Sequence, residues 1–112
     1  MSRFAPLPAD LPYYAVIFTA QLSDDTTGYG QMSAKMVELA AQQPGYVGVE
    51  STRDGEGLGI TVSYWADEAA LMGWKQVSEH LYAQNMGKQK WYEHYTLRVA
   101  KVERHYDGPE GR

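Results

Sequence analysis

Residues 57–92 read GLGITVSYWADEAALMGWKQVSEHLYAQNMGKQKWY, and the rest of the chain is arranged around this passage from a strand pattern into a helix pattern. Leu58 to Trp65 is rich in β-formers and follows a glycine, which predicts a strand. Asp67 is a good N-cap, and Glu68 complements the dipole of the helix that follows. Spacings of four, three and four then separate Ala70, Trp74, Val77 and Leu81. This periodicity predicts a helix.

The two faces of the predicted strand differ, because side chains alternate along a strand. Leu58, Ile60, Val62 and Tyr64 form an apolar face, and Gly59, Thr61, Ser63 and Trp65 form a smaller, partly polar one. The helix pattern after it fits one helix from Asp67 to Trp91 or two pieces. A single helix would have 25 residues, so we expect a break, near Ser78 or Gly87.

Upstream, the centre of Tyr13 to Leu22 is apolar at both sets of alternating positions, which predicts a strand covered on both faces. Helical spacing predicts a helix over Thr27 to Gln42, which Pro44 and Gly45 end. Residues 46–52 predict a further strand, joined by an Asp-Gly turn signal to the strand at 58–65. Alternation at the end of the chain predicts a last strand over His94 to Tyr106.

The resulting order is β-α-β-β-α-β, which predicts an α+β, ferredoxin-like fold with both helices on one face of a four-stranded antiparallel sheet. The other face of that sheet then needs a cover. Because no further helix is predicted, a second copy of the same sheet is the simplest cover. We therefore expect a face-to-face homodimer.

The 112 residues fit a single domain. We expect a flexible arm or intersubunit strap over residues 1–12, where prolines disfavour helix, a folded domain over 13–106 and a disordered tail over 107–112. The net charge of -4 disfavours binding to the phosphate backbone of nucleic acid. No apolar run is long enough to span a membrane. Zero cysteines exclude disulfides and thiol chemistry, and the cytoplasm is the default location.

Three segments resemble the antibiotic biosynthesis monooxygenase family of the dimeric α+β barrel superfamily. They are ELAAQQPGYVGVES at 38–51, ITVSYWADEAALMGWK at 60–75 and EHLYAQNMGKQKWYEHYTLRVAKVER at 79–104. The resemblance covers about Ala15 to Tyr106 and implies the barrel fold. Similar folds host quinol- or anthrone-type monooxygenases, haem-degrading enzymes, isomerases and proteins without a known activity.

The resemblance implies that Trp74 stands where such monooxygenases place a tryptophan facing the cavity between helices and sheet; the alternative is an ordinary core aromatic. Haem-degrading relatives pair that tryptophan with an asparagine on the first strand and a histidine ten positions further on. This chain has Thr19 and Gln21 on the first strand and Gln84 at the later position. Haem degradation is therefore disfavoured.

His80 is a candidate general base, because imidazole exchanges protons near neutral pH; the alternative is a histidine on the helix surface. Aromatic residues gather in the same region and suit a flat apolar ligand, although each fits core or interface packing as well: Tyr64, Tyr82, Trp91, Tyr92 and Tyr95. Arg98 could orient an oxyanion or form an exposed salt bridge. The three histidines are too scattered to predict a metal site, and the glycines at 55, 57 and 59 belong to the hairpin.

The leading hypothesis is a small cofactor-independent monooxygenase that acts on a phenol-, quinol- or anthrone-like aromatic molecule. In it Trp74 and His80 are catalytic, and the expected substrate-binding residues are Thr19, Tyr64, Tyr82, Gln84, Asn85, Trp91 and Arg98. No cofactor is expected. The alternatives are a non-catalytic ligand-binding or structural dimer of the same fold and, third, a haem-binding protein.

Overall fold

The computed structural model describes residues 3–85 and 90–109, and its secondary structure follows the predicted order. The elements are β1 (Tyr13–Leu22), α1 (Tyr29–Ala41), β2 (Tyr46–Arg53), β3 (Leu58–Trp65), α2 (Glu68–Asn85) and β4 (Tyr92–Val102). They form a four-stranded antiparallel sheet in the order β2-β3-β1-β4. The predicted α+β, ferredoxin-like fold is confirmed.

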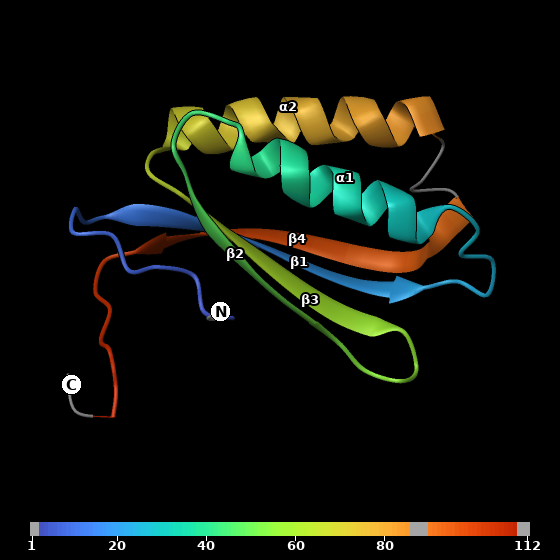
Figure 1. Ribbon diagram of the computed structural model, residues 1–112, viewed down its shortest axis with the longest axis horizontal. Coiled ribbons are helices and arrows are strands. Elements are labelled where there is room, and N and C mark those ends of the chain that lie inside the picture. Colours follow the sequence, from blue (N-terminus) through green and yellow to red (C-terminus); the bar gives the residue numbers. More distant parts are fainter. Residues whose placement is uncertain (1–2, 86–89, 110–112) are drawn as a thin grey trace.

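Both helices lie on one side of the sheet (Figure 1). On that side of β3 are Thr61, Ser63 and Trp65, and Trp65 is fully buried against Ala40 of α1 and Leu71 of α2. The apolar set that includes Leu58 and Ile60 therefore faces away from the helices, where these two side chains remain 45% and 41% exposed. We call this second side the open face of the sheet.

The helix boundaries correct the sequence-based prediction at three points. The first helix begins at Tyr29 instead of Thr27, because Gly28 has a left-handed φ of 84° just before it, and it ends at Ala41 instead of Gln42. The predicted break near Ser78 is wrong, and α2 runs unbroken to Asn85. The Ser78 hydroxyl donates to the carbonyl oxygen of Lys75 at 3.1 Å, which lets a serine sit inside a helix. The other predicted break, near Gly87, lies outside the described residues.

The last strand is shorter at its C-terminal end than predicted and begins earlier. β4 spans Tyr92–Val102, so the predicted limits His94 and Tyr106 are both wrong. The strand begins at Tyr92 because this residue pairs with Leu22, and it ends at Val102 because its partner there, Tyr13, is the first residue of β1. Residues beyond 102 have run past the end of the neighbouring strand.

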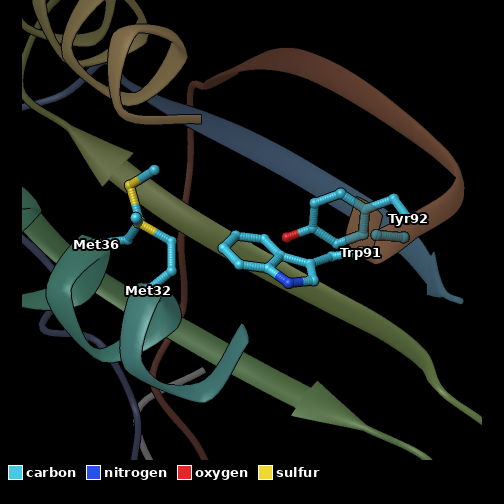
Figure 2. Close-up of a cluster of buried hydrophobic side chains, with 5 residues drawn as sticks. Met32, Met36, Trp91 and Tyr92 are labelled. Atoms are coloured by element: carbon cyan, nitrogen blue, oxygen red, sulfur yellow. The ribbon is translucent and has the colours of Figure 1, made fainter. Parts of the chain in front are cut away.

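The core between helices and sheet consists of two clusters. One contains Ala40, Trp65 and Leu71. The other joins Met32 and Met36 of α1 to Trp91 and Tyr92 at the start of β4, as Figure 2 shows. Burial of such side chains stabilises a fold by about 1.5–3 kcal/mol each. The helices are therefore fixed to the sheet at both ends, and the space between the clusters is where the cavity described below lies.

The N-terminal segment turns back beneath the open face, on the side away from the helices (Figure 1). The backbone N–H of Ala5 donates to Glu50 Oε2 at 2.9 Å. A side chain at Gly48 would fall 2.8 Å from the Ala5 Cβ, so glycine allows this close approach. At the other end, the structure describes residues 107–109 of the predicted tail. Among the described helices, none is both long and apolar enough to cross a membrane.

Candidate functional site

A cavity of about 220 Å³ lies between the two helices and the sheet, and all six elements contribute to its lining. Most of its wall is apolar. The apolar lining residues include Val16, Phe18, Met36, Leu71, Trp74 and Leu97. A largely apolar pocket with a few polar groups is the usual form of a site for a small organic molecule.

Helix α2 forms one wall through a single face of the helix. Trp74, Lys75, Ser78, Glu79 and Tyr82 all line the cavity. Their spacing of one, three, one and three residues places them on the same side of an α-helix. The direction of the helix is set at its start, where Asp67 Oδ1 accepts a hydrogen bond from the Ala70 N–H at 2.8 Å.

The indole of Trp74 is held by the core beside it. It stacks on Trp65 with ring centroids 5.9 Å apart and an angle of 20° between the planes. Trp65 is completely buried, and its Nε1 donates to Ser63 Oγ at 2.9 Å. Because Trp65 cannot move, it is a rigid support for Trp74. Trp74 itself is only partly buried and lines the cavity.

Tyrosine side chains form one end of the cavity. The hydroxyls of Tyr82 and Tyr92 are 3.1 Å apart, and Tyr29 meets the Tyr92 ring edge to face at 5.9 Å. Burial is the main cause that raises the pKa of both Tyr82 and Tyr92 above the ordinary tyrosine value. These two phenols therefore stay protonated at neutral pH and act there as neutral hydrogen-bond donors and acceptors.

Small hydroxyl side chains line the floor of the cavity on β2 and β3. Ser51 Oγ and Thr61 Oγ1 are 2.7 Å apart, and Ser63 lies two residues beyond Thr61 on the same face of β3. The Ser63 oxygen accepts the hydrogen bond from Trp65, so its own proton remains available to an acceptor. The sheet side of the cavity therefore offers hydroxyl groups in an otherwise apolar surface.

Two opposite charges lie on the α2 wall. Lys75 Nζ and Glu79 Oε1 are 4.0 Å apart, and their side chains are 47% and 52% exposed. A pair this exposed contributes little to stability. Glu79 is the carboxylate among the lining residues of the described chain, and Lys75 is the ammonium. A base and a cation are therefore in reach of a bound ligand.

Of the sequence-predicted site residues, the structure brings Trp74 and Tyr82 together at the cavity. His80 is exposed and is not part of the lining, because it lies off the helix face that carries Trp74 and Tyr82. Gln84 is likewise exposed and away from the cavity. The side chain of Asn85 lies outside the described residues.

Three further candidates lie on the open face, so the sheet separates them from the cavity. Thr19 pairs with Ile60 and Arg98 pairs with Ile17, which places both on the side away from the helices. Tyr64 is on the same side, where its hydroxyl donates to Glu50 Oε1 at 2.8 Å. Burial first, and this bond second, raise the pKa of Tyr64 to about 12. These three residues therefore do not lie beside Trp74, because side chains alternate between the two faces of a strand.

Trp91 has a packing role in the structure. It is 4% exposed, meets Tyr29 edge to face at 5.7 Å, and donates from Nε1 to the carbonyl oxygen of Thr27 at 2.8 Å. It therefore holds the turn that precedes α1 against the start of β4. It does not line the cavity.

The sequence analysis missed several lining residues: Tyr29, Ser51, Thr61, Ser63, Lys75 and Glu79. For Lys75 and Glu79 a signal existed, because Lys75 lies four residues before Glu79 and Glu79 lies three before Tyr82, spacings that place side chains on one helix face. Tyr29 lines the cavity from the first residue of α1. In the described part of the chain, no group of three or more His, Asp or Glu side chains could hold a metal ion.

Comparison with known proteins finds a matching family and a similar protein. A model of the family described as antibiotic biosynthesis monooxygenase matches residues 12–86. The protein named uncharacterized protein YqjZ, from Bacillus subtilis (strain 168), is 49% identical over 104 residues, which cover 93% of this chain and 91% of that protein.

Two solved structures have the same fold. PA3566 from Pseudomonas aeruginosa matches with a TM-score of 0.65 and 16% identity, over 85% of this chain and 96% of that one. SnoaB, a cofactor-independent oxygenase from Streptomyces nogalater, matches with a TM-score of 0.61 and 14% identity, over 88% of this chain and 98% of that one. At such identities the likeness is one of fold.

Proposed function

Because the chain belongs to the antibiotic biosynthesis monooxygenase family, we propose that it is a cofactor-independent monooxygenase of a small phenol-, quinol- or anthrone-like molecule. The observation that carries the proposal is the apolar, aromatic-walled cavity with Trp74 on one side and hydroxyl groups at its end and floor. Such a pocket suits a flat aromatic molecule that carries one or two oxygens. The fold shared with SnoaB, a cofactor-independent oxygenase, supports the same activity.

The proposed reaction needs dioxygen as its only co-reactant. For an anthrone-like substrate, a CH₂ group activated by a phenolic oxygen loses a proton, and the resulting anion donates an electron to dioxygen. One oxygen atom then forms the new C=O bond, and the other leaves as water with the two hydrogens that the carbon has lost. The substrate supplies all four electrons, so the protein only has to bind, deprotonate and exclude water.

The cavity offers a group for each of these tasks. Trp74 packs against the aromatic ring of the substrate, because its indole lines the wall and is supported by Trp65. Glu79 accepts the proton, since its carboxylate lies on the same wall five residues further along α2. One proton of the Tyr82–Tyr92 hydroxyl pair joins the two oxygens, and the pair donates its other proton to the oxyanion that develops. His80 has no part in this proposal, because it lies outside the cavity.

Oxygen uptake tests the proposal. Wild-type protein should consume dioxygen with at least one member of a panel of reduced quinones, anthrones and naphthols. Loss of a general base typically costs about 10²–10⁴-fold in rate, so Glu79→Gln should fall by that range. Glu38→Gln, an exposed change on α1 away from the cavity, is the matched control and should keep the full rate. Absence of turnover across the panel, or equal rates for both variants, would refute the proposal.

A non-catalytic ligand-binding protein of the same fold is the second candidate. It is favoured by the position of His80, because no imidazole lines the cavity within the described residues. This candidate predicts tight binding of the reduced aromatic molecules without any oxygen uptake. Haem binding, the third candidate, predicts a Soret shift on titration with haem; the lack of a histidine on the lining counts against it.

We also propose that two copies of the chain pair through the open faces of their sheets. The exposed Leu58 and Ile60 on that face support a cover of this kind, because an apolar sheet face is costly to leave in water. Light scattering at micromolar concentration should return twice the chain mass of 12.6 kDa. A mass of 12.6 kDa would exclude the dimer.

A further inference from the structure

Arg53, the last residue of β2, lies across the sheet and reaches the tyrosine end of the cavity. Its Nη2 donates to the hydroxyl of Tyr29 at 3.0 Å, and its Nη1 donates to the carbonyl oxygen of Gly57. The guanidinium carbon is 5.5 Å from the centre of the Tyr29 ring. A Cβ at Gly59 would fall 2.6 Å from that carbon, so the glycine makes room for the arginine to lie flat. Arg53 itself does not line the cavity.

The hydrogen bond from Arg53 determines that the Tyr29 hydroxyl oxygen is an acceptor on that side. A phenol has one proton, and its oxygen already accepts from Arg53. The proton of Tyr29 therefore points away from Arg53, and Tyr29 also hydrogen-bonds the side chain of Tyr92. Tyr29 lines the cavity, next to Tyr92 and hence to the Tyr82–Tyr92 hydroxyl pair.

The arrangement ends a group of partly buried hydroxyls with the permanent positive charge of an exposed guanidinium. Guanidinium keeps its charge at any physiological pH, and hydrogen bonds inside a protein polarise one another along a chain. Donors polarised by a cation bind an anionic oxygen more strongly than a neutral one. The raised pKa values of Tyr82 and Tyr92 are consistent with this role, because these phenols remain protonated when a phenolate approaches.

We propose that Arg53 is a positioning residue that acts through Tyr29 and makes the tyrosine end of the cavity selective for the deprotonated oxygen of a phenolic ligand with one or two rings. The ring count follows from the volume of about 220 Å³, which is below the roughly 300–1,000 Å³ of pockets for drug-sized molecules. The inference rests on the proposed function for the same cavity. It adds the residue that selects the charge state of the ligand and limits the ligand's size.

Among the described lining residues, the charged ones are Lys75 and Glu79 on α2. Their side chains are half exposed, and the carboxylate offsets the ammonium 4.0 Å away. Water screens such a pair. Lys75 is nevertheless the rival source of any preference for an anion, so the experiment includes it.

The experiment uses 4-nitrophenol, a single-ring ligand whose phenol and phenolate forms differ in colour. Binding of each form is measured by absorbance and calorimetry below and above the pKa of the free ligand. Wild type should bind the phenolate more tightly than the phenol, and so lower the pKa of the bound ligand. Arg53→Met and Tyr29→Phe should weaken phenolate binding by about five- to tenfold and phenol binding by less than about twofold.

Matched variants separate positioning from simple structural damage. Arg104→Met removes the same charge at an exposed position beyond β4 and should change neither affinity. Arg53→Lys should restore part of the phenolate preference, and Tyr29→Phe keeps the ring that packs against Trp91. If Arg53→Met fails to fold, Arg53→Lys and Tyr29→Phe still carry the test, because both retain the packing.

Three results would overturn the inference: no binding of either form by wild type, equal losses of phenol and phenolate binding in the variants, or a larger effect of Lys75→Met than of Arg53→Met. A separate measurement of oxygen uptake distinguishes failure of the inference about Arg53 from failure of the proposed function. Phenolate selectivity that depends on Arg53 without any oxygen uptake removes only the monooxygenase proposal. Oxygen uptake with selectivity independent of Arg53 removes only the inference about Arg53.

Discussion

Gly45→Ala is expected to be strongly destabilising, because Gly45 links the connection that follows α1 to the connection that precedes α2. This residue follows α1 with a φ of 80°, and its carbonyl oxygen accepts the N–H of Ala66, just before α2, at 2.8 Å. A Cβ on Gly45 would clash with the Cβ of Ala70 in the first turn of α2.

Two separate costs give the magnitude. A non-glycine residue in the left-handed region costs roughly 1–2 kcal/mol. Inserting a methyl group into packed structure costs about 1–3 kcal/mol more. The free energy of unfolding should therefore fall by about 2–5 kcal/mol, out of the 5–15 kcal/mol of a typical domain. The cause of the second cost is specific, because Ala70 must move away and take the start of α2 with it.

Urea unfolding followed by circular dichroism and tryptophan fluorescence measures the loss, with all proteins at one concentration. The double variant Gly45→Ala/Ala70→Gly separates the two costs, since it removes the clash and leaves the φ penalty. A double-mutant cycle should return a favourable coupling of about 1–3 kcal/mol. Gly55→Ala is the control, because a Cβ there meets nothing within 4 Å, and it should stay within about 0.5 kcal/mol of wild type. A loss below about 0.5 kcal/mol for Gly45→Ala, or no coupling to Ala70, would refute this reasoning.

Gly73→Ala should raise the free energy of unfolding by about 0.5–1 kcal/mol in the same urea assay, because Gly73 lies inside α2 and a Cβ there meets nothing within 4 Å. Ser63→Ala should lower it by about 1–3 kcal/mol and shift the tryptophan emission, since the buried Nε1 of Trp65 loses its acceptor; an unchanged spectrum and stability would contradict this. Above about pH 10 stability should fall, because Tyr82 and Tyr92 have raised pKa values in the folded state and the unfolded chain loses these protons first. Tyr82→Phe should make urea midpoints fall less steeply between about pH 10 and pH 11. An equally steep decline would show that Tyr82 does not contribute to the loss of stability at high pH.

The element order and the fold class could be predicted from the sequence because they depend on local patterns. Alternation predicted four strands, and helical spacing predicted two helices. Pro44 and Gly45 correctly ended the first helix within a residue of its observed limit. The cap at Asp67 was also predicted, since a carboxylate before a helical run meets free backbone N–H groups. These interactions join residues that are close in sequence.

The candidate site was predicted only in part. Trp74 and Tyr82 line the cavity, whereas Thr19, Tyr64 and Arg98 lie on the open face. Alternation shows which residues of a strand share a face, but it does not say which face the helices cover. That choice depends on how Trp65 packs between the two helices, which is a tertiary contact.

From its sequence alone the chain determines the order of its elements, the shared face of α2 that carries Trp74, and the family to which it belongs. Only the tertiary structure decides that Arg53, 24 residues after Tyr29, meets its hydroxyl across Gly59, and that Tyr82 meets Tyr92. The physical reason is the distance along the sequence over which each interaction acts. Hydrophobic periodicity acts within one helix or strand, whereas the hydroxyl cluster exists only where α1, α2 and β4 converge.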